Sequence, residues 1–283
     1  MSRVVTFAVM GDSAASGVGD SDRNGINKGW GYYLAKHFDG PLIYLNVSRP
    51  GAQSFEVLND QLPKALLHLP DITAVIVGGN DALRNGFNPE KVRHNLRQIL
   101  IQLHKSGSEI LLLELHDPTR IVPFPPLVGS VIGKRIDAVN AVTLSLAKEF
   151  DAIILRTRKL ENIYDRKVWH VDRMHPSKFG HQLIATNFRE LLVKVGWNIQ
   201  PIETEPISAK SNSDTILWML KHGIPWFLKR SLDLFPSLIY IMAGELASQL
   251  KTITQPSKNN VIHVEFKNQS EAELQEVFEQ RIS

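Results

Sequence analysis

The sequence of 283 residues contains no cysteine. This absence excludes a disulfide framework, a zinc site with thiolate ligands and a cysteine nucleophile. Long apolar runs are also missing, because no stretch reaches the roughly 18 apolar residues that a membrane-spanning helix needs. Basic residues form no stripe either, since 32 Lys and Arg are scattered among 29 Asp and Glu. Nucleic-acid binders usually gather such residues on one face, so no nucleic-acid partner is expected.

The chain does contain ample apolar material for a large core, with 43% hydrophobic residues. Residues 4–10 form a short apolar run that follows a single Arg. A signal peptide usually starts with a more basic region, so we interpret this run as a buried first strand and expect a cytoplasmic protein.

Short apolar runs alternate with helical patterns up to about residue 195. The runs are almost continuously apolar, which is typical of parallel strands buried on both faces. Such alternation predicts an α/β domain whose central parallel sheet is covered by helices on both faces. The predicted strands are residues 4–10, 42–47, 74–78, 110–115 and 152–155, and the predicted helices are 30–38, 55–67, 89–105, 132–150 and 178–195.

The pattern changes after residue 196, so we assign residues 1–196 to the α/β domain. Residues 197–213 contain two prolines and many polar residues without periodicity, which predicts a linker. Residues 214–283 are predicted to form a helical C-terminal extension. Its aromatic residues Trp218, Trp226 and Phe227 favour packing on the domain or covering its cleft as a lid. The alternative is peripheral contact with a membrane or lipid substrate.

Four polar segments follow predicted strands or precede the last helix. Ligands bind at the carboxyl ends of strands in an open parallel sheet, so we expect these segments to converge on one site. They are Gly11-Asp12-Ser13, Asn46-Val47-Ser48-Arg49-Pro50-Gly51, Gly78-Gly79-Asn80-Asp81 and Asp172-Arg173-Met174-His175-Pro176.

The residue types in these segments suit nucleophilic catalysis. A serine hydroxyl needs an adjacent base, and His175 can take the proton of Ser13. Asp172 can orient the imidazole and stabilise its charged form. Attack on an ester carbonyl creates an oxyanion, which needs prearranged donors. The candidate donors are the main-chain N–H groups of Ser13 and Gly51 and the side-chain amide of Asn80.

In this order the four segments resemble the SGNH/GDSL hydrolase family, whose signature Ser, Gly, Asn and His map onto Ser13, Gly51, Asn80 and His175. The resemblance covers roughly residues 4–195. It implies a flavodoxin-like three-layer α/β/α fold, a triad completed by Asp172, and ester hydrolysis through an acyl-enzyme without a metal or other cofactor. The second segment departs from the family pattern, because Pro50 precedes the glycine and lacks an N–H.

The expected function is therefore that of an esterase or lipase acting on small-molecule or lipid esters. A carbohydrate O-acetylesterase or a thioesterase would use the same residues. A non-catalytic protein that binds lipid or a partner through its C-terminal extension is the alternative from another class.

Two neighbouring histidines, His170 and His181, are expected to be structural, because one follows Trp169 in an apolar patch and the other lies in a helical pattern. No metal is expected, since Asp172 and His175 lack two further ligands nearby. The glycines of residues 11–19 do not follow the dinucleotide-binding pattern Gly-x-Gly-x-x-Gly.

Overall fold

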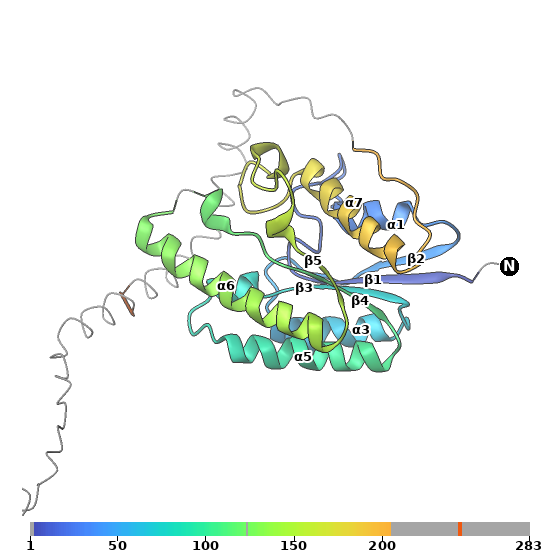
Figure 1. The fold of residues 1–283 in the computed structure, drawn as a ribbon, viewed down its shortest axis with the longest axis horizontal. Helices are drawn as coiled ribbons and strands as arrows, with labels where there is room; N and C mark the ends of the chain where they lie inside the picture. Colours follow the sequence, from blue (N-terminus) through green and yellow to red (C-terminus); the bar gives the residue numbers. More distant parts are fainter. Residues whose placement is uncertain (1–2, 123, 205–242, 245–283) are drawn as a thin grey trace, which may run out of the picture. The chain divides into compact units, whose positions relative to one another are not determined.

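The computed structural model describes residues 3–122, 124–204 and 243–244 (Figure 1). Within these residues five strands form one sheet in the order β2-β1-β3-β4-β5, and every neighbouring pair is parallel. The predicted parallel sheet is thus confirmed. The strands are β1 (Val5–Gly11), β2 (Leu42–Asn46), β3 (Ile72–Ile76), β4 (Glu109–Leu113) and β5 (Ile153–Leu155).

Helices cover both faces of the sheet, which confirms the three-layer α/β/α architecture (Figure 1). Helices α1 and α7 pack on one face, and α3, α5 and α6 pack on the other. The α-helices are α1 (Gly29–Lys36), α2 (Ser54–Glu56), α3 (Leu62–Leu66), α4 (Gly79–Leu83), α5 (Pro89–Lys105), α6 (Pro126–Glu149) and α7 (Lys178–Lys194). A π-helix, η1 (Val57–Gln61), joins α2 to α3, and short 3₁₀ turns are η2 (Pro118–Arg120), η3 (Thr157–Lys159) and η4 (Arg166–Val168).

The core follows from the alternation of side chains along β1. Phe7 and Val9 are fully buried in the layer beneath α1 and α7. Ala8 and Met10 are equally buried in the layer beneath α3 and α5. Successive side chains of a strand point to opposite faces, so one continuous apolar strand supplies both layers. This arrangement places the carboxyl end of β1, and the segment after it, between the carboxyl ends of β2 and β3.

Helix α5 shows how closely a periodic pattern can fix an element. The predicted helix 89–105 coincides with the observed Pro89–Lys105. Asn88 caps it, since its side-chain oxygen accepts the N–H of Glu90 at 2.8 Å, and Pro89 occupies the first turn, where its missing N–H costs nothing.

Two helices differ from their predictions by more than one or two terminal residues. Helix α6 begins at Pro126 rather than at residue 132, because Gly129 and Gly133 obscured the periodicity of its first turns. The predicted continuous helix 55–67 contains the π-turn η1 instead. Only Leu62 separates this turn from Pro63, which has no N–H to donate to the preceding turn.

The strands lie within two residues of their predicted bounds, and two of them differ in a way that has a physical reason. The third runs from Ile72 to Ile76 rather than over 74–78, because the chain turns at Gly78 to begin α4. The second lies at the edge of the sheet, so it is not buried on both faces: Ile43 is 53% exposed.

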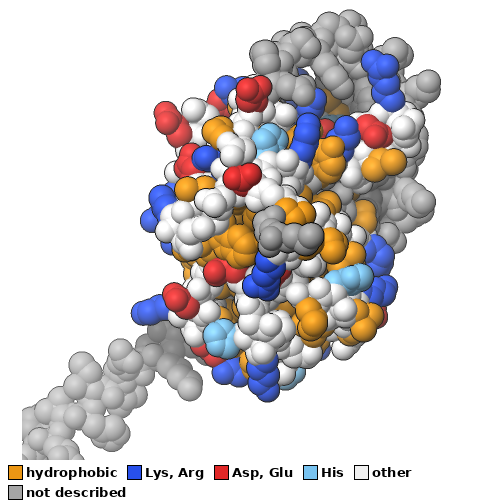
Figure 2. Space-filling view, turned by 90° about the vertical axis from the view of Figure 1, so that its right-hand side faces the viewer, with side chains coloured by type: hydrophobic (Ala, Val, Ile, Leu, Met, Phe, Trp, Pro, Cys, Tyr) orange, Lys and Arg blue, Asp and Glu red, His pale blue; other side chains and the backbone are white. Residues whose placement is uncertain are grey.

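Residues that follow α7 return to the domain. Ile199 is buried and pairs with Phe38 in an antiparallel bridge, and Ile202 is buried too. Most of the predicted linker and of the C-terminal extension, including Trp218, lies outside the described residues. Among the helices that the structure describes, none is long and apolar enough to cross a membrane. Figure 2 shows the face at the amino end of β1, where basic, acidic and hydrophobic side chains are interspersed.

Candidate active site

Ser13 lies in the turn that directly follows β1. The turn starts at Gly11, whose φ of +139° is open to glycine alone in practice, and a Cβ there would lie 1.9 Å from the carbonyl oxygen of Ile76. The N–H of Asp12 donates to that same carbonyl at 3.1 Å. The chain therefore leaves the sheet abruptly and presents Ser13 half-buried at the carboxyl edge.

The side chain of Gln61 stabilises this turn through two hydrogen bonds to Gly11. Its side-chain oxygen accepts the N–H of Gly11 at 2.7 Å, and its side-chain nitrogen donates to the Gly11 carbonyl at 2.9 Å. Arg49 adds its main-chain N–H to that carbonyl at 3.1 Å. Gln61 is buried at the last position of η1. The sequence analysis missed it; the available signal was an uncharged polar residue within the predicted helix 55–67.

His175 joins the first and last of the predicted segments. Its Nε2 lies 2.8 Å from the Ser13 hydroxyl, and its Nδ1 lies 2.8 Å from Oδ2 of Asp172. A carboxylate only accepts hydrogen bonds, so Nδ1 carries the hydrogen and Nε2 is left to accept the serine hydroxyl. Oδ1 of Asp172 accepts the main-chain N–H groups of Met174 at 2.9 Å and His175 at 3.0 Å.

The two carboxylates near His175 have opposite pKa shifts. Burial raises the pKa of Asp172, but contacts from His170 and His175 outweigh burial, so this pKa lies well below its usual value. Burial raises the pKa of Asp12 to about 6, and the neighbouring charge of Asp81 adds to the effect. Asp172 therefore stays charged throughout the neutral range, whereas Asp12 takes up a proton in mildly acidic solution.

The loop after β2 forms a tight turn over Arg49, Pro50, Gly51 and Ala52. The N–H of Ala52 donates to the carbonyl of Arg49 at 3.1 Å. Proline at the second position and a glycine with φ of +83° at the third are typical of a type II turn. Pro50 is thus compatible with the turn, and the turn's own hydrogen bond does not use the N–H of Gly51. Asn80, in the first turn of α4, donates its side-chain amide to the carbonyl of Ala52 at 3.1 Å.

Asp81 secures α4 against this loop. Its carboxylate accepts the main-chain N–H of Ser54 at 3.0 Å and the Ser54 hydroxyl at 2.6 Å. Asn95 of α5 donates to the same hydroxyl at 3.0 Å. Burial raises the pKa of Asp81, and the hydrogen bonds from Ser54 oppose that rise. Because β2, β1 and β3 are neighbours in the sheet, Ser13, Gly51 and Asn80 come from adjacent loops at one edge.

The remaining histidines of this region differ in their surroundings. His181 is fully buried, accepts the N–H of Trp30 at 3.3 Å and contacts the carbonyl of Val18 at 3.0 Å, so its predicted packed role is confirmed. His116, just after β4, was missed by the sequence analysis. Its ring lies 3.9 Å from that of Trp169, and burial lowers its pKa to about 3.

Comparison with known proteins agrees with this geometry. Residues 9–183, more than half of the chain, match the model of the GDSL-like lipase/acylhydrolase family. The chain belongs to this family. It is 31% identical over 183 residues to thioesterase 1/protease 1/lysophospholipase L1 of Escherichia coli K12, covering 64% of this chain and 79% of that protein.

Two further proteins are similar to this chain. An arylesterase of Vibrio mimicus is 26% identical over 136 residues, which cover 47% of this chain and 62% of that protein. The crystal structure of TesA superposes with a TM-score of 0.53 at 25% identity, covering 67% of this chain and 99% of that one. The protein is accordingly a GDSL-type hydrolase, as the sequence resemblance predicted.

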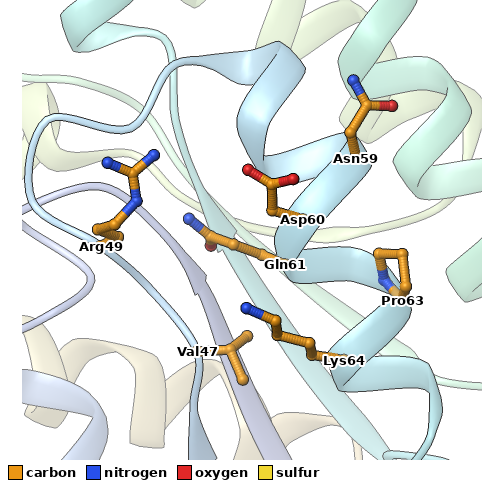
Figure 3. Close-up of a pocket in the computed structure, with 7 residues that line it drawn as sticks. All are labelled: Val47, Arg49, Asn59, Asp60, Gln61, Pro63 and Lys64. Atoms are coloured by element: carbon orange, nitrogen blue, oxygen red, sulfur yellow. The ribbon is translucent and has the colours of Figure 1, made fainter.

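A cavity of about 440 Å³ in this hydrolase lies beside the end of β2. Figure 3 shows Gln61 between the side chains of Arg49 and Lys64 there. Neither Ser13 nor His175 lines it, so it lies behind the turn that carries Ser13. The lining residues are Val47, Arg49, Asn59, Asp60, Gln61, Pro63 and Lys64. Within the described part of the chain, no three His, Asp or Glu side chains are grouped so that they could hold a metal ion.

Proposed function

We propose that this hydrolase cleaves carboxylic esters with Ser13 as nucleophile, His175 as general base and Asp172 as the group that orients His175. The proposal is carried by one observation, the row of hydrogen bonds from the Ser13 hydroxyl to His175 and from His175 to Asp172, each at 2.8 Å. Both bonds fall within the range in which a proton can pass between heavy atoms.

In the first half of the reaction, Ser13 Oγ attacks the ester carbonyl carbon while its proton moves to Nε2 of His175. The carbonyl oxygen becomes an oxyanion. When the intermediate collapses, the bond to the alcohol breaks, and the imidazolium returns its proton to the leaving oxygen. The products of this half are a free alcohol and an acyl group on Ser13.

In the second half, water takes the place of the alcohol. His175 removes a proton from water, and the hydroxide equivalent attacks the acyl carbon. When the second intermediate collapses, the imidazolium returns its proton to Ser13 Oγ, which releases the carboxylic acid and restores the Ser13 hydroxyl. The charged Asp172 stabilises the imidazolium in both halves, and its lowered pKa favours that role across the neutral range.

Donors for the oxyanion are available at the same edge. We assign the main-chain N–H groups of Ser13 and Gly51 and the side-chain amide of Asn80 to this task. The amide nitrogen of Asn80 has two hydrogens, so its bond to Ala52 leaves one for the substrate while fixing the plane of the amide. Removal of one such donor typically costs about a hundredfold to a thousandfold in rate.

A thioester is the second candidate substrate, because the Escherichia coli relative is named a thioesterase and is 31% identical. The same intermediates would form, with a thiol as the leaving group. An O-acetylated carbohydrate is the third candidate substrate, with a sugar hydroxyl as the leaving group. Peripheral membrane contact through residues 214–283 and a cytoplasmic location remain predictions from the sequence.

The test is hydrolysis of p-nitrophenyl acetate, butyrate and decanoate by wild type and Ser13→Ala, with acetyl and decanoyl thioesters and acetylated xylose measured in parallel. We expect wild type to turn over at least one series and the variant to lose that activity, with unchanged folding by circular dichroism. Equal activity of the two proteins would remove Ser13 from the reaction.

The same panel addresses the non-catalytic alternative. If wild type turns over none of these substrates, while vesicle binding depends on Trp218 and Trp226 and survives Ser13→Ala, the protein acts as a binding module instead.

A further inference from the structure

His170 lies in the same turn as the proposed catalytic pair. Its main-chain N–H donates to the carbonyl of His175 at 2.8 Å. An antiparallel bridge between Trp169 and Pro176 closes the base of the turn. The side chain of His170 is thereby placed beside the carboxylate of Asp172, although the proposed mechanism assigns it no task.

The backbone around His170 is held in a demanding conformation. Its carbonyl accepts the N–H of Arg173 at 2.9 Å, and Arg173 has a φ of +56°, which costs energy in a residue with a side chain. The Cβ of His170 packs on the segment that follows the nucleophile, since a Cβ built on Gly19 would lie 3.4 Å from it. The main chain and the Cβ of His170 are therefore held from two sides.

The decisive contact is between His170 and Asp172. Nδ1 of His170 lies 3.3 Å from Oδ2 of Asp172, the same oxygen that Nδ1 of His175 contacts at 2.8 Å. The other oxygen, Oδ1, accepts the main-chain N–H groups of Met174 and His175. Each carboxylate oxygen thus faces two nitrogens. This arrangement determines the rotation of the carboxylate about its bond to Cβ.

Burial strengthens these contacts. The side chain of His170 is 22% exposed and that of Asp172 is 11% exposed, so water screens their interaction only weakly. Burial by itself raises the pKa of Asp172, and the contact with His170 is the largest effect that lowers it. Two other titratable groups lie nearby. His181, whose pKa burial lowers to about 4, interacts with His170 and His175, and Asp12 interacts with His175.

We propose that His170 is a positioning residue, whose imidazole holds the Asp172 carboxylate charged and in the rotamer that accepts Nδ1–H of His175. This inference rests on the proposed function, because His170 acts on the reaction only through the triad. His170 is not assigned to the substrate, so its loss reduces kcat and leaves KM unchanged.

The first test compares His170→Phe, which keeps a ring of similar size without a donor, with His170→Asn, whose amide nitrogen can occupy the position of Nδ1. On p-nitrophenyl acetate we expect His170→Phe to lower kcat about tenfold, the effect of losing one close contact between a ring nitrogen and the carboxylate, and His170→Asn to restore most of it. His94, exposed on α5, supplies the matched control His94→Phe, which should behave as wild type.

Unchanged kcat in His170→Phe, or a rise in KM with constant kcat, would overturn the proposal. A lowered kcat that His170→Asn fails to restore would overturn it as well. Thermal unfolding verifies that each variant is folded, and His170→Ala, which has no ring to accommodate, replaces His170→Phe if that variant does not fold.

The second test is a double-mutant cycle with Asp172→Asn. If His170 acts through Asp172, adding His170→Phe to Asp172→Asn lowers kcat no further. An equal tenfold loss in both backgrounds would overturn the inference. Ser13→Ala in the same assay distinguishes failure of the proposed function from failure of the role of His170. Activity that survives in Ser13→Ala refutes the proposed function. An inactive Ser13→Ala together with a fully active His170→Phe refutes only the role of His170.

Discussion

The turn after β1 and the turn before α7 each bring a carboxylate to His175, and the two carboxylates are held in different ways. Asp12, in the first turn, accepts the N–H of Ala14 at 3.0 Å and lies near the negative charge of Asp81. Asp172, in the second, faces four nitrogens at 2.8 to 3.3 Å. The pKa of Asp12 rises to about 6, whereas that of Asp172 falls.

Burial alone does not explain this difference, since it raises the pKa of both groups. What separates them is the number of donors that face the charged form, because each donor favours ionisation. The turn before α7 is therefore built to keep a permanent charge next to His175. The turn after β1 holds Ser13, the proposed nucleophile, and its carboxylate is ionised only above mildly acidic pH.

The largest effect is expected from Asp172→Asn, which abolishes the charge in the second turn. The amide can donate to Nδ1 of His175 and so force the hydrogen onto Nε2, where it blocks proton transfer from Ser13. We expect kcat to fall by about a thousandfold to ten thousandfold on p-nitrophenyl acetate at pH 8. A loss of less than tenfold would show that the charge difference between the turns has no role in the reaction.

Asn80→Ala alters neither turn, so its effect on catalysis reports oxyanion stabilisation alone, without a change in either carboxylate. We expect kcat to fall by about a hundredfold to a thousandfold, because the amide acts in the transition state, and KM to change little. Steady-state kinetics on the preferred p-nitrophenyl ester give both constants. A rise in KM with unchanged kcat would contradict the assignment of Asn80.

Asp12→Asn tests the first turn through stability. A carboxyl whose pKa rises from 3.8 to about 6 on folding binds its proton more tightly in the folded protein. It therefore favours folding below pH 3.8, and that contribution is lost as the pH rises through about 6. The neutral amide avoids this loss. The free energy of unfolding of Asp12→Asn should therefore exceed that of wild type by up to about 3 kcal/mol at pH 8 and by almost nothing near pH 4.

Urea unfolding of wild type and Asp12→Asn at pH 4 and pH 8 measures this difference. A gain of the same size at both pH values would mean that ionisation of Asp12 is not its cause.

Gln61→Leu tests the support behind the first turn and has the smallest expected effect. The variant keeps the side-chain volume but leaves the buried N–H of Gly11 without its acceptor, which costs about 2 kcal/mol in the free energy of unfolding. Asn59→Ala, an exposed amide on the same π-turn, is the matched control and should cost less than about 0.5 kcal/mol. Equal losses in the two variants would show that the contact with Gly11 is not stabilising.

The parts that could be predicted from the sequence depend on local pattern. The helix 89–105 was predicted to its last residue, and the parallel sheet followed from apolar runs between helices. Ser13, Asp172 and His175 were named because each lies next to a predicted element, and the structure brings them within hydrogen-bonding distance of one another.

The parts that could not be predicted depend on contacts between distant residues. The role of Gln61 requires a π-turn that places its amide on Gly11, fifty positions earlier. Pro50 looked unfavourable as a residue without an N–H, yet the turn from Arg49 to Ala52 accommodates it at the second position. His170 was expected to be structural because it follows apolar residues in the sequence. The sequence does not reveal that its ring lies close to the carboxylate of Asp172 in the fold.

The most direct measurement is covalent labelling of the nucleophile. Wild type, Ser13→Ala and His175→Ala are treated with a fluorophosphonate, which reacts only with an activated serine, and the peptides are analysed by mass spectrometry. We expect a single adduct on the peptide that contains Ser13, absent from Ser13→Ala and formed far more slowly in His175→Ala. An adduct on another serine, or equal labelling of Ser13 in His175→Ala, would contradict the proposed triad.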